Sequence, residues 1–167
     1  MKNVILIGMP AVGKTTIGKR IASQLNMLFI DTDDVIRNAC MTTLPELLDK
    51  YGLDGFKTIE ERVICACNYT NTVIATGGSA VYGAKAMAHL KENGVVVYLK
   101  ISYEEIVKRL RKMKSRGVAI KDGQTLSELY EERKILYEKY ADIIVGVDGN
   151  SVEQTLKNCL AKIKELV

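Results

Sequence analysis

Long apolar runs, paired cysteines and flexible linkers are all missing from this sequence. No stretch approaches the ~18 apolar residues that a membrane-spanning helix needs, and residues 1–7 read as the start of a strand pattern, unlike a signal peptide. The cysteines have no zinc-site spacing, and Cys65 and Cys67 resemble small buried hydrophobic residues; the other two are Cys40 and Cys159. We therefore expect a cytoplasmic protein with reduced thiols and no membrane contact.

The composition is that of an ordinary folded protein. Of its 167 residues, 47% are hydrophobic and 26% are charged, which excludes disordered, collagen-like and disulfide-scaffold classes. No Pro/Gly/Ser-rich linker and no repeat divides the chain, so we expect a single domain over residues 1–167. The net charge of +4 is too small by itself to indicate binding to a nucleic-acid backbone.

Short apolar runs alternate with amphipathic stretches along the chain. The apolar runs are Val4–Gly8, Met27–Asp31, Thr72–Ala75, Val95–Lys100 and Ile143–Val145. The predicted helices are Lys14–Gln24, Asp34–Ala39, Leu44–Tyr51, Gly55–Tyr69, Ala80–Glu92, Tyr103–Lys114, Thr125–Tyr140 and Ser151–Leu166. This alternation is typical of βα units, and it predicts an α/β fold around a parallel sheet that is buried on both faces.

The segment GMPAVGKT, residues 8–15, follows the first apolar run and opens the first helical pattern. In that context it is a phosphate-binding loop: glycines let the backbone wrap a phosphate, and the helix N-terminus supplies positive potential. Lys14 is expected to reach the outer phosphates, and Thr15 to offer an oxygen to Mg²⁺. A merely structural turn would leave both side chains unexplained. The loop predicts nucleoside triphosphate binding.

The phosphate loop alone does not separate switches, motors, transporters and small kinases. A GTPase needs a guanine-reading motif of the NKxD type, and Lys157-Asn158, the nearest sequence to it, falls in a predicted helix. A compact metabolite or nucleotide kinase is the leading interpretation for a chain of this length.

Acidic residues gather where the second predicted strand ends, in FIDTDD over residues 29–34. Ligands of doubly wound sheets bind at the carboxyl ends of the strands, and a kinase needs one carboxylate near Mg²⁺ and another at the acceptor hydroxyl. Asp31 and Asp33 have the alternate spacing for these tasks. The simpler alternative is that Asp33 or Asp34 only caps the following helix.

The stretch from Lys108 to Arg116 holds six basic residues in nine positions and no acid. Such a run is usually a solvated helix face or loop, and that interpretation stays open for Lys108, Lys112 and Lys114. In a phosphoryl transferase, however, a lid that carries cations can exclude water and neutralise the transferring group.

Taken together, the chain resembles the shikimate kinases, small relatives of the nucleoside monophosphate kinases. The matching segments, in order, are GMPAVGKTT, FIDTDDVI, YGLDGFKTIEE, VIATGGSA, the basic stretch ending in Arg116, and YEERKILYEKYADIIV. The resemblance implies a three-layer P-loop kinase fold, with a five-stranded parallel sheet in the order 2-3-1-4-5 and a mobile lid over about residues 112–124. It also implies a monomer that phosphorylates the 3-hydroxyl of shikimate with ATP and Mg²⁺ in aromatic amino-acid biosynthesis.

The resemblance also implies roles for individual residues. The catalytic residues would be Lys14, Asp33 as the base and Arg116 as the lid arginine. Asp31 would assist the metal held by Thr15. The nucleotide would contact Gly8, Ala11, Gly13, Lys14, Thr15, Thr16 and Arg109, the last of these near adenine. A substrate-binding region over about residues 33–62 would supply Asp33 and Lys57 to the acceptor. The other acceptor contacts would be Gly77, Gly78, Ser79 and Arg133. The two glycines would offer backbone N–H groups, and Arg133 would pair with the acceptor carboxylate.

The sequence departs from the family pattern mainly on the acceptor side. Lys57 stands where the family has an arginine, and a lysine cannot grip a carboxylate with a bidentate fork. Arg62 does not replace it, because five residues along a helix leave it about 140° off that face. Ser79 replaces a third glycine, and Gly117 replaces a proline after Arg116; Met41 also occupies a position that is often glycine. ATP and Mg²⁺ are therefore firmer expectations than shikimate.

Three functions stay open from the sequence. The first is shikimate kinase, and the second is a related kinase for another small hydroxylated metabolite, which Lys57 and Ser79 motivate. The third is a non-catalytic nucleotide-binding regulatory domain, although such a domain has no evident need for the full set of catalytic residues. Nucleic-acid binding ranks last, because no platform of paired aromatic residues accompanies the basic run.

Overall fold

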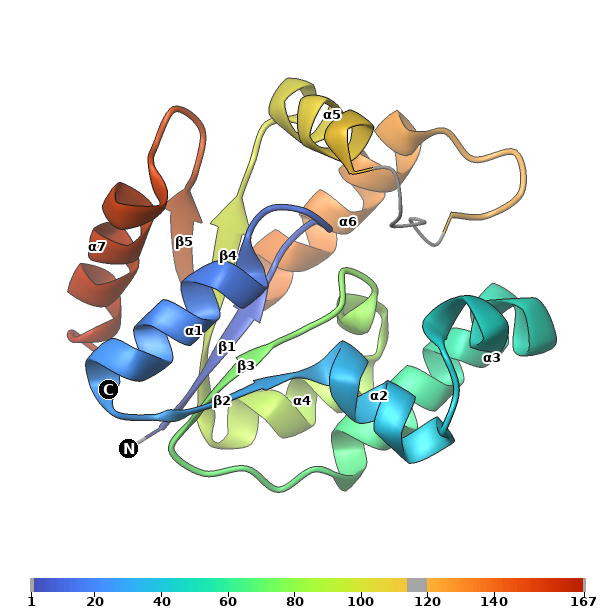
Figure 1. The fold of residues 1–167 in the computed structure, drawn as a ribbon, viewed down its shortest axis with the longest axis horizontal. Coiled ribbons are helices and arrows are strands. Elements are labelled where there is room, and N and C mark those ends of the chain that lie inside the picture. Colours follow the sequence, from blue (N-terminus) through green and yellow to red (C-terminus); the bar gives the residue numbers. More distant parts are fainter. Residues whose placement is uncertain (1, 114–119, 167) are drawn as a thin grey trace.

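The computed structural model describes residues 2–113 and 120–166, and its centre is a five-stranded parallel sheet (Figure 1). The strands are β1 (Asn3–Ile7), β2 (Leu28–Asp31), β3 (Thr72–Ala75), β4 (Gly94–Lys100) and β5 (Ile143–Gly146). They are ordered β2-β3-β1-β4-β5, which confirms the predicted fold class. The sheet changes direction of winding at β1, so the loop that follows β1 lies at the switch point where such sheets bind ligands.

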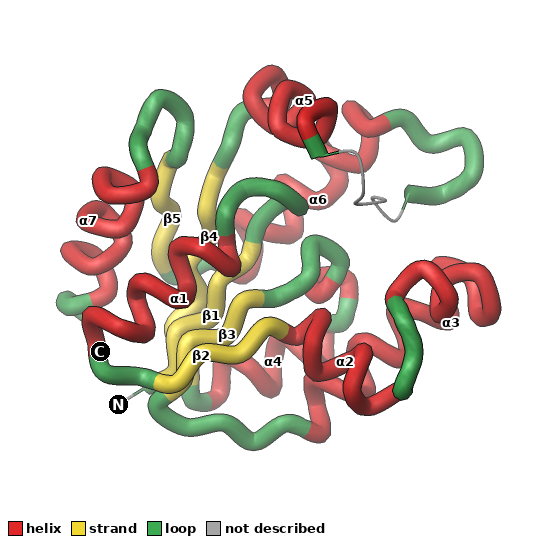
Figure 2. The backbone as a smooth tube through the Cα atoms, viewed as in Figure 1, coloured by secondary structure: helices red, strands yellow, loops and turns green. Residues whose placement is uncertain are grey.

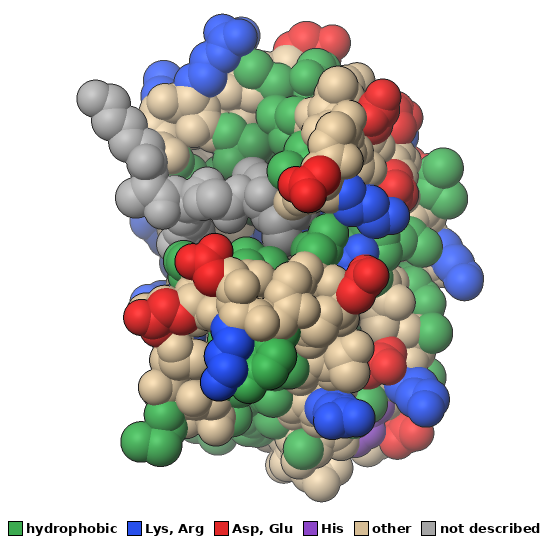
Figure 3. Space-filling view, turned by 90° about the vertical axis from the view of Figure 1, so that its right-hand side faces the viewer, with side chains coloured by type: hydrophobic (Ala, Val, Ile, Leu, Met, Phe, Trp, Pro, Cys, Tyr) green, Lys and Arg blue, Asp and Glu red, His purple; other side chains and the backbone are tan. Residues whose placement is uncertain are grey.

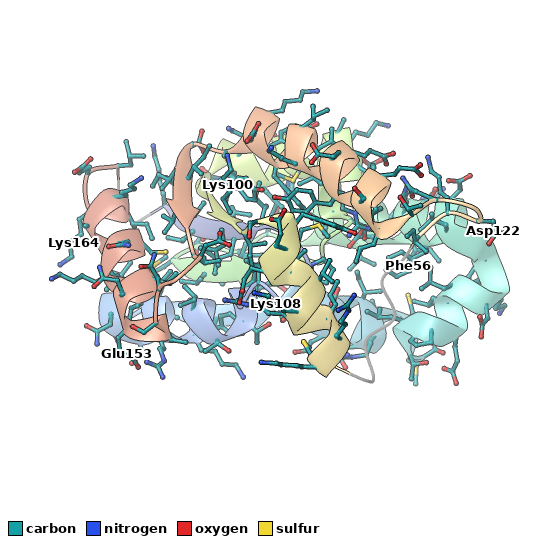
Figure 4. All side chains as sticks on the ribbon, turned by 90° about the horizontal axis from the view of Figure 1, so that it is seen from above. Phe56, Lys100, Lys108, Asp122, Glu153 and Lys164 are labelled. Carbon is teal, nitrogen blue, oxygen red and sulfur yellow. The ribbon has the colours of Figure 1, made fainter. Side chains whose placement is uncertain are left out.

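Helices cover both faces of this sheet (Figure 2). They are α1 (Lys14–Leu25), α2 (Thr32–Cys40), α3 (Leu44–Ala66), α4 (Ala84–Glu92), α5 (Tyr103–Lys112), α6 (Leu126–Tyr140) and α7 (Val152–Ile163). Seen from above, α1 and α7 lie on one side of the sheet and α6 on the other, while α5, which carries Lys108, crosses over the middle (Figure 4). None of the described helices combines the length and the apolar composition of a membrane span.

The predicted elements are present, with ends that differ by a few residues. Residues 80–92, predicted as one helix, are instead a 3-10 turn over Ala80–Tyr82 and then α4, because Gly83 has an extended backbone (φ −81°, ψ 94°). α3 consists of two helical segments that meet at a kink at Gly52, which agrees with the two helices predicted on either side of residue 52. The backbone of Gly52 is not helical (φ 69°, ψ −179°), a conformation that favours glycine. α5 ends at Lys112, two residues before its predicted end.

The apolar side chains form two separate cores. The larger one lies on both faces of the sheet, and Ile5, Val96 and Tyr98 are among its members. Strands β1 and β3 are buried along their whole length and β4 except at its two end residues, whereas β5 is buried only at alternate residues. The smaller one lies between α2 and α3 and consists of three buried residues, Ile36, Leu47 and Phe56. Cys65 and Cys67, which were predicted to be buried, are only half-buried, as is Cys40, whereas Cys159 is buried.

Candidate functional site

The phosphate loop joins β1 to α1, and its backbone demands glycine at two positions. Gly8 has φ +145°, and a Cβ there would lie 2.8 Å from the backbone oxygen of Leu99 on β4. Gly13, directly before α1, has φ +106° and no side chain that could cap the helix. The first amides of α1 are therefore available to an anion, as in other helix N-termini that bind phosphate.

Lys14 lies inside this loop. Its Nζ donates to the carbonyl oxygens of Gly8 (2.6 Å) and Met9 (2.8 Å), and only 8% of the residue is exposed. The ammonium is thus held by the loop's own backbone at the place where the helix amides converge. Ala11 in the same loop takes the left-handed conformation (φ 66°), and Thr16, on the first turn of α1, is exposed.

The phosphate loop and the end of β2 meet through Thr15 and Asp31. The Thr15 hydroxyl donates to Asp31 Oδ2 (2.8 Å), and Asp31 Oδ1 accepts from the backbone N–H of Asp33 (3.0 Å). Asp31 is therefore the residue that caps α2, which contradicts the alternative interpretation that Asp33 or Asp34 serves only as that cap. Asp33 contributes its backbone N–H to this cap.

Thr15 and Asp31 present a donor set that suits a small hard cation. Mg²⁺ in nucleotide sites is held by one or two protein oxygens, by phosphate oxygens and by waters. A hydroxyl and a carboxylate at hydrogen-bond distance beside a phosphate loop match that pattern. Among the residues that the structure describes, no cluster of three or more His, Cys, Asp or Glu offers an all-protein metal site.

The turn after β3 gathers the predicted acceptor residues. A Cβ on Gly77 would lie 2.8 Å from Asp33 Oδ1, and one on Gly78 would lie 2.8 Å from Arg133 Nη1 and 2.9 Å from Pro10 of the phosphate loop. Only glycines let the carboxylate, the guanidinium and the loop approach this closely. The structure therefore brings Asp33 and Arg133, which are 100 positions apart, to the same turn beside the nucleotide side of the site.

The backbone of this turn differs from the prediction in one respect. The N–H of Gly77 donates to the Thr32 hydroxyl (3.1 Å). This amide is therefore bonded within the protein and is not directed at the acceptor substrate. The carbonyl of Gly78 accepts from the Tyr137 hydroxyl (2.7 Å). The role of the Gly78 amide stays a prediction.

Lys57 and Arg133 reach this region from α3 and α6. Arg133 is 2% exposed, and both cations lie near the ring of Tyr82: Lys57 Nζ is 3.8 Å and Arg133 Cζ is 5.6 Å from its centroid. Burial lowers the pKa of Lys57, and the positive charges of Lys121 and Arg133 lower it further. The structure thus brings together the two cations that the sequence assigned to the acceptor carboxylate.

Glu60 belongs to this site, although the sequence analysis did not select it. It is 2% exposed, its Oε1 accepts from the Ser79 hydroxyl (2.7 Å), and its Oε2 would lie 2.9 Å from a Cβ on Gly77. Burial raises the pKa of Glu60 to about 7, the Ser79 hydrogen bond opposes that rise, and the charge of Asp33 adds to it. The sequence feature that could have indicated Glu60 is its position three residues after Lys57, which puts both side chains on the same face of the helix.

The lid side of the site is only partly described. Arg109 on α5 donates to the backbone oxygen of Val12 in the phosphate loop (3.1 Å) and pairs with Glu105 (3.3 Å), so it lies against the nucleotide side; its contact with adenine stays a prediction. Arg116 and Gly117 lie outside the described residues.

Met41 is 92% exposed at the end of α2. The face with α2 and α3 carries interspersed cations and anions (Figure 3).

The sheet order, the phosphate loop after the central strand and the acids after β2 define a P-loop kinase fold that serves a small acceptor. The family model for shikimate kinase matches residues 10–164. The chain therefore belongs to the shikimate kinase family.

Individual relatives agree with this assignment. The chain is 35% identical over 163 residues to the shikimate kinase of Caldanaerobacter subterraneus, covering 96% of this chain and 95% of that one. It is 37% identical over 166 residues to that of Francisella tularensis subsp. novicida, covering 97% and 92%. Among solved structures, the shikimate kinase of Acinetobacter baumannii in complex with shikimate has a TM-score of 0.87 and 29% identity, covering 99% of this chain and 94% of that chain.

Proposed function

We propose that this protein transfers the γ-phosphoryl group of ATP to the 3-hydroxyl of shikimate. The observation that carries the proposal is the convergence of Asp33 and Arg133 on the Gly77–Gly78 turn, which also touches Pro10 of the phosphate loop. This arrangement supports an acceptor that is bound directly beside the transferring phosphate. The family membership and the similar structure that holds shikimate support the choice of acceptor.

On the nucleotide side, the residues supply charge and position. The Lys14 ammonium and the first amides of α1 would neutralise the phosphate oxygens, where charge spreads during transfer. Thr15 and Asp31 would hold Mg²⁺, which when bound offsets the charge of the nucleotide phosphates. Arg116 is proposed to approach the same phosphates from the lid.

On the acceptor side, Asp33 would accept the proton of the attacking hydroxyl. Its side chain is half-buried at the edge of the Gly77–Gly78 turn, and the capping of α2 is done by Asp31 instead. Lys57 and Arg133 would bind the carboxylate of the acceptor and so orient the hydroxyl toward Asp33. Such orientation contributes to the rate as well as to affinity.

The first test measures ADP release with shikimate in a coupled assay. The wild-type protein is expected to turn over shikimate, and Asp33→Asn is expected to lower kcat by about 10²–10⁴-fold, because the base is lost. Its affinity for ADP, measured by calorimetric titration, should change by less than about three-fold. Asp34→Asn is the matched control, since Asp34 is exposed and pairs with Arg37. Equal activity in both variants contradicts the assignment of the base.

A second candidate is a kinase for another small hydroxylated acid, and the Lys57 position favours it. A point charge on a flexible stem recognises a carboxylate with less geometric demand than a bidentate arginine. A panel of hydroxy acids, homoserine, gluconate and nucleoside monophosphates in the same assay distinguishes the two. A higher kcat/KM for any of these than for shikimate would replace the proposed acceptor. If neither shikimate nor any compound of the panel stimulates ADP release, a regulatory nucleotide-binding domain is favoured.

A further inference from the structure

Tyr82 is placed where it can control the acceptor's carboxylate site. It ends the 3-10 turn Ala80–Tyr82, which begins two residues after Gly78, and its ring lies 3.8 Å from Lys57 Nζ and 5.6 Å from Arg133 Cζ. Both distances fall within the range at which an aromatic face attracts a cation. One ring therefore contacts both cations that the acceptor carboxylate needs.

The ring itself is fixed from the other side. The Tyr82 hydroxyl donates to Glu132 Oε1 (2.5 Å), and Glu132 Oε2 accepts from Gln124 Nε2 (3.2 Å). Glu132 is adjacent in sequence to Arg133 on α6, so the hydrogen bond ties the ring to the helix that carries the second cation. The ring is half-buried and held at its hydroxyl end, which makes it a stable surface for Lys57.

Lys57 needs such a surface. A lysine side chain has a flexible four-carbon stem, and its ammonium is ordered only where a partner holds it. Burial is the main cause of the lowered pKa of Lys57, Lys121 lowers that pKa further, and Arg133 adds a smaller repulsion of the same sign. Attraction to the ring offsets that repulsion, and it leaves two neighbouring cations whose charge a bound carboxylate would neutralise.

We propose that Tyr82 is a positioning residue that holds Lys57 beside Arg133 and thereby gives the site its preference for acceptors with a carboxylate. The proposal deepens the proposed function and rests on it. It assigns the ring a role in acceptor binding and none in the transfer step. Loss of the ring should therefore raise KM for shikimate, lower kcat by a smaller factor through the displaced Lys57, and leave KM for ATP nearly unchanged.

The kinetic test compares Tyr82→Leu with Tyr82→Phe. Tyr82→Leu is expected to raise KM for shikimate about five-fold. Tyr82→Phe keeps the ring, so its KM for shikimate should stay close to that of the wild type. With the carboxamide of shikimate, which has no negative charge, the two variants should have the same KM. In a Lys57→Met background the effect of Tyr82→Leu should fall below two-fold. An effect that persists with the carboxamide or without Lys57 shows a merely structural role and overturns the proposal.

A substrate-free measurement separates this proposal from the proposed function. In NMR spectra of the apo protein, the side-chain protons of Lys57 should be shifted upfield by the ring, in the wild type and in Tyr82→Phe but not in Tyr82→Leu; Lys57→Arg assigns the signal. An unshifted wild-type signal overturns the placement of Lys57. If the shift is present but shikimate is neither bound nor phosphorylated, the proposed acceptor is wrong and the carboxylate preference falls with it, while the contact itself stands.

Discussion

At the scale of single residues, Glu60 makes the stability depend on pH. Burial raises its pKa to about 7 from the 4.5 of an unperturbed glutamate. Between these values the folded protein keeps a proton that the unfolded chain has lost, so the free energy of unfolding falls as the pH rises. The stabilisation is fully present below about pH 4.5 and is lost above about pH 7.

We therefore predict that Glu60→Gln flattens this dependence. Between pH 5 and pH 8 the wild type should lose on the order of 2–3 kcal/mol more unfolding free energy than the variant. Urea unfolding at four pH values measures the difference, in which the titrations of all other groups largely cancel. Parallel curves for the two proteins would show that Glu60 is ionised in the folded state throughout.

The residues that sequence analysis missed are those whose roles arise from spatial neighbours. Lys14, Thr15 and Asp31 could be assigned because the phosphate loop and the strand end are local patterns. Glu60 bonds to Ser79, 19 residues away, and Tyr82 contacts Lys57, 25 residues away, so spacing along the chain does not reveal these partners. At most it places Glu60 on the same face of α3 as Lys57. Ser79 was recognised as a departure from the family, but its partner was visible only in the fold.

At the scale of elements, the phosphate loop has a backbone requirement that can be tested. Gly8→Ala places a Cβ 2.8 Å from the Leu99 carbonyl oxygen at φ +145°, so the loop must move or be strained. We expect a loss of about 1–3 kcal/mol in unfolding free energy, with ADP affinity lowered at least ten-fold because the loop amides shift. Thermal unfolding and calorimetric titration measure the two effects.

Gly146→Ala on β5 is the matched control for that prediction. A Cβ there meets nothing within 4 Å, and Gly146 does not have a positive φ. Its unfolding free energy should change by less than about 0.5 kcal/mol, which is usual for surface substitutions. If the two glycine variants change the unfolding free energy equally, the close approach of Gly8 to β4 has no importance for stability.

The helices and strands could be predicted because buried apolar residues recur along the chain in patterns typical of each element. Strands covered on both faces appear as short apolar runs, and the five predicted runs match β1–β5 to within one residue at each end. Breaks inside helical patterns were harder. The extended backbone at Gly83 divides a stretch whose composition is helical throughout, since hydrophobic spacing continues across the break.

At the scale of the whole molecule, stability is unevenly distributed. The large core includes most of the sheet and its covering helices, whereas α2 and the first half of α3 are held by the small core of Ile36, Leu47 and Phe56. A segment with few buried apolar contacts opens at a lower free energy than the whole protein unfolds. Lys57 lies on this weaker part, next to Phe56, so acceptor binding should order it.

We therefore predict sub-global opening of residues 32–57, which contain the small core and Lys57. Amide exchange followed by mass spectrometry should show these residues exchanging at a lower free energy than β1 and β4, and saturating shikimate should protect them selectively. Phe56→Leu should speed exchange there by about ten-fold and leave β4 unchanged, since Phe56 belongs to the small core. Val96→Ala, in the large core, should instead speed the exchange of β1 and β4 and leave that of the small-core segment unchanged, because this segment opens while the sheet stays intact. Equal responses to both substitutions would mean that the two cores unfold as one unit, and that acceptor binding has no separate segment to order.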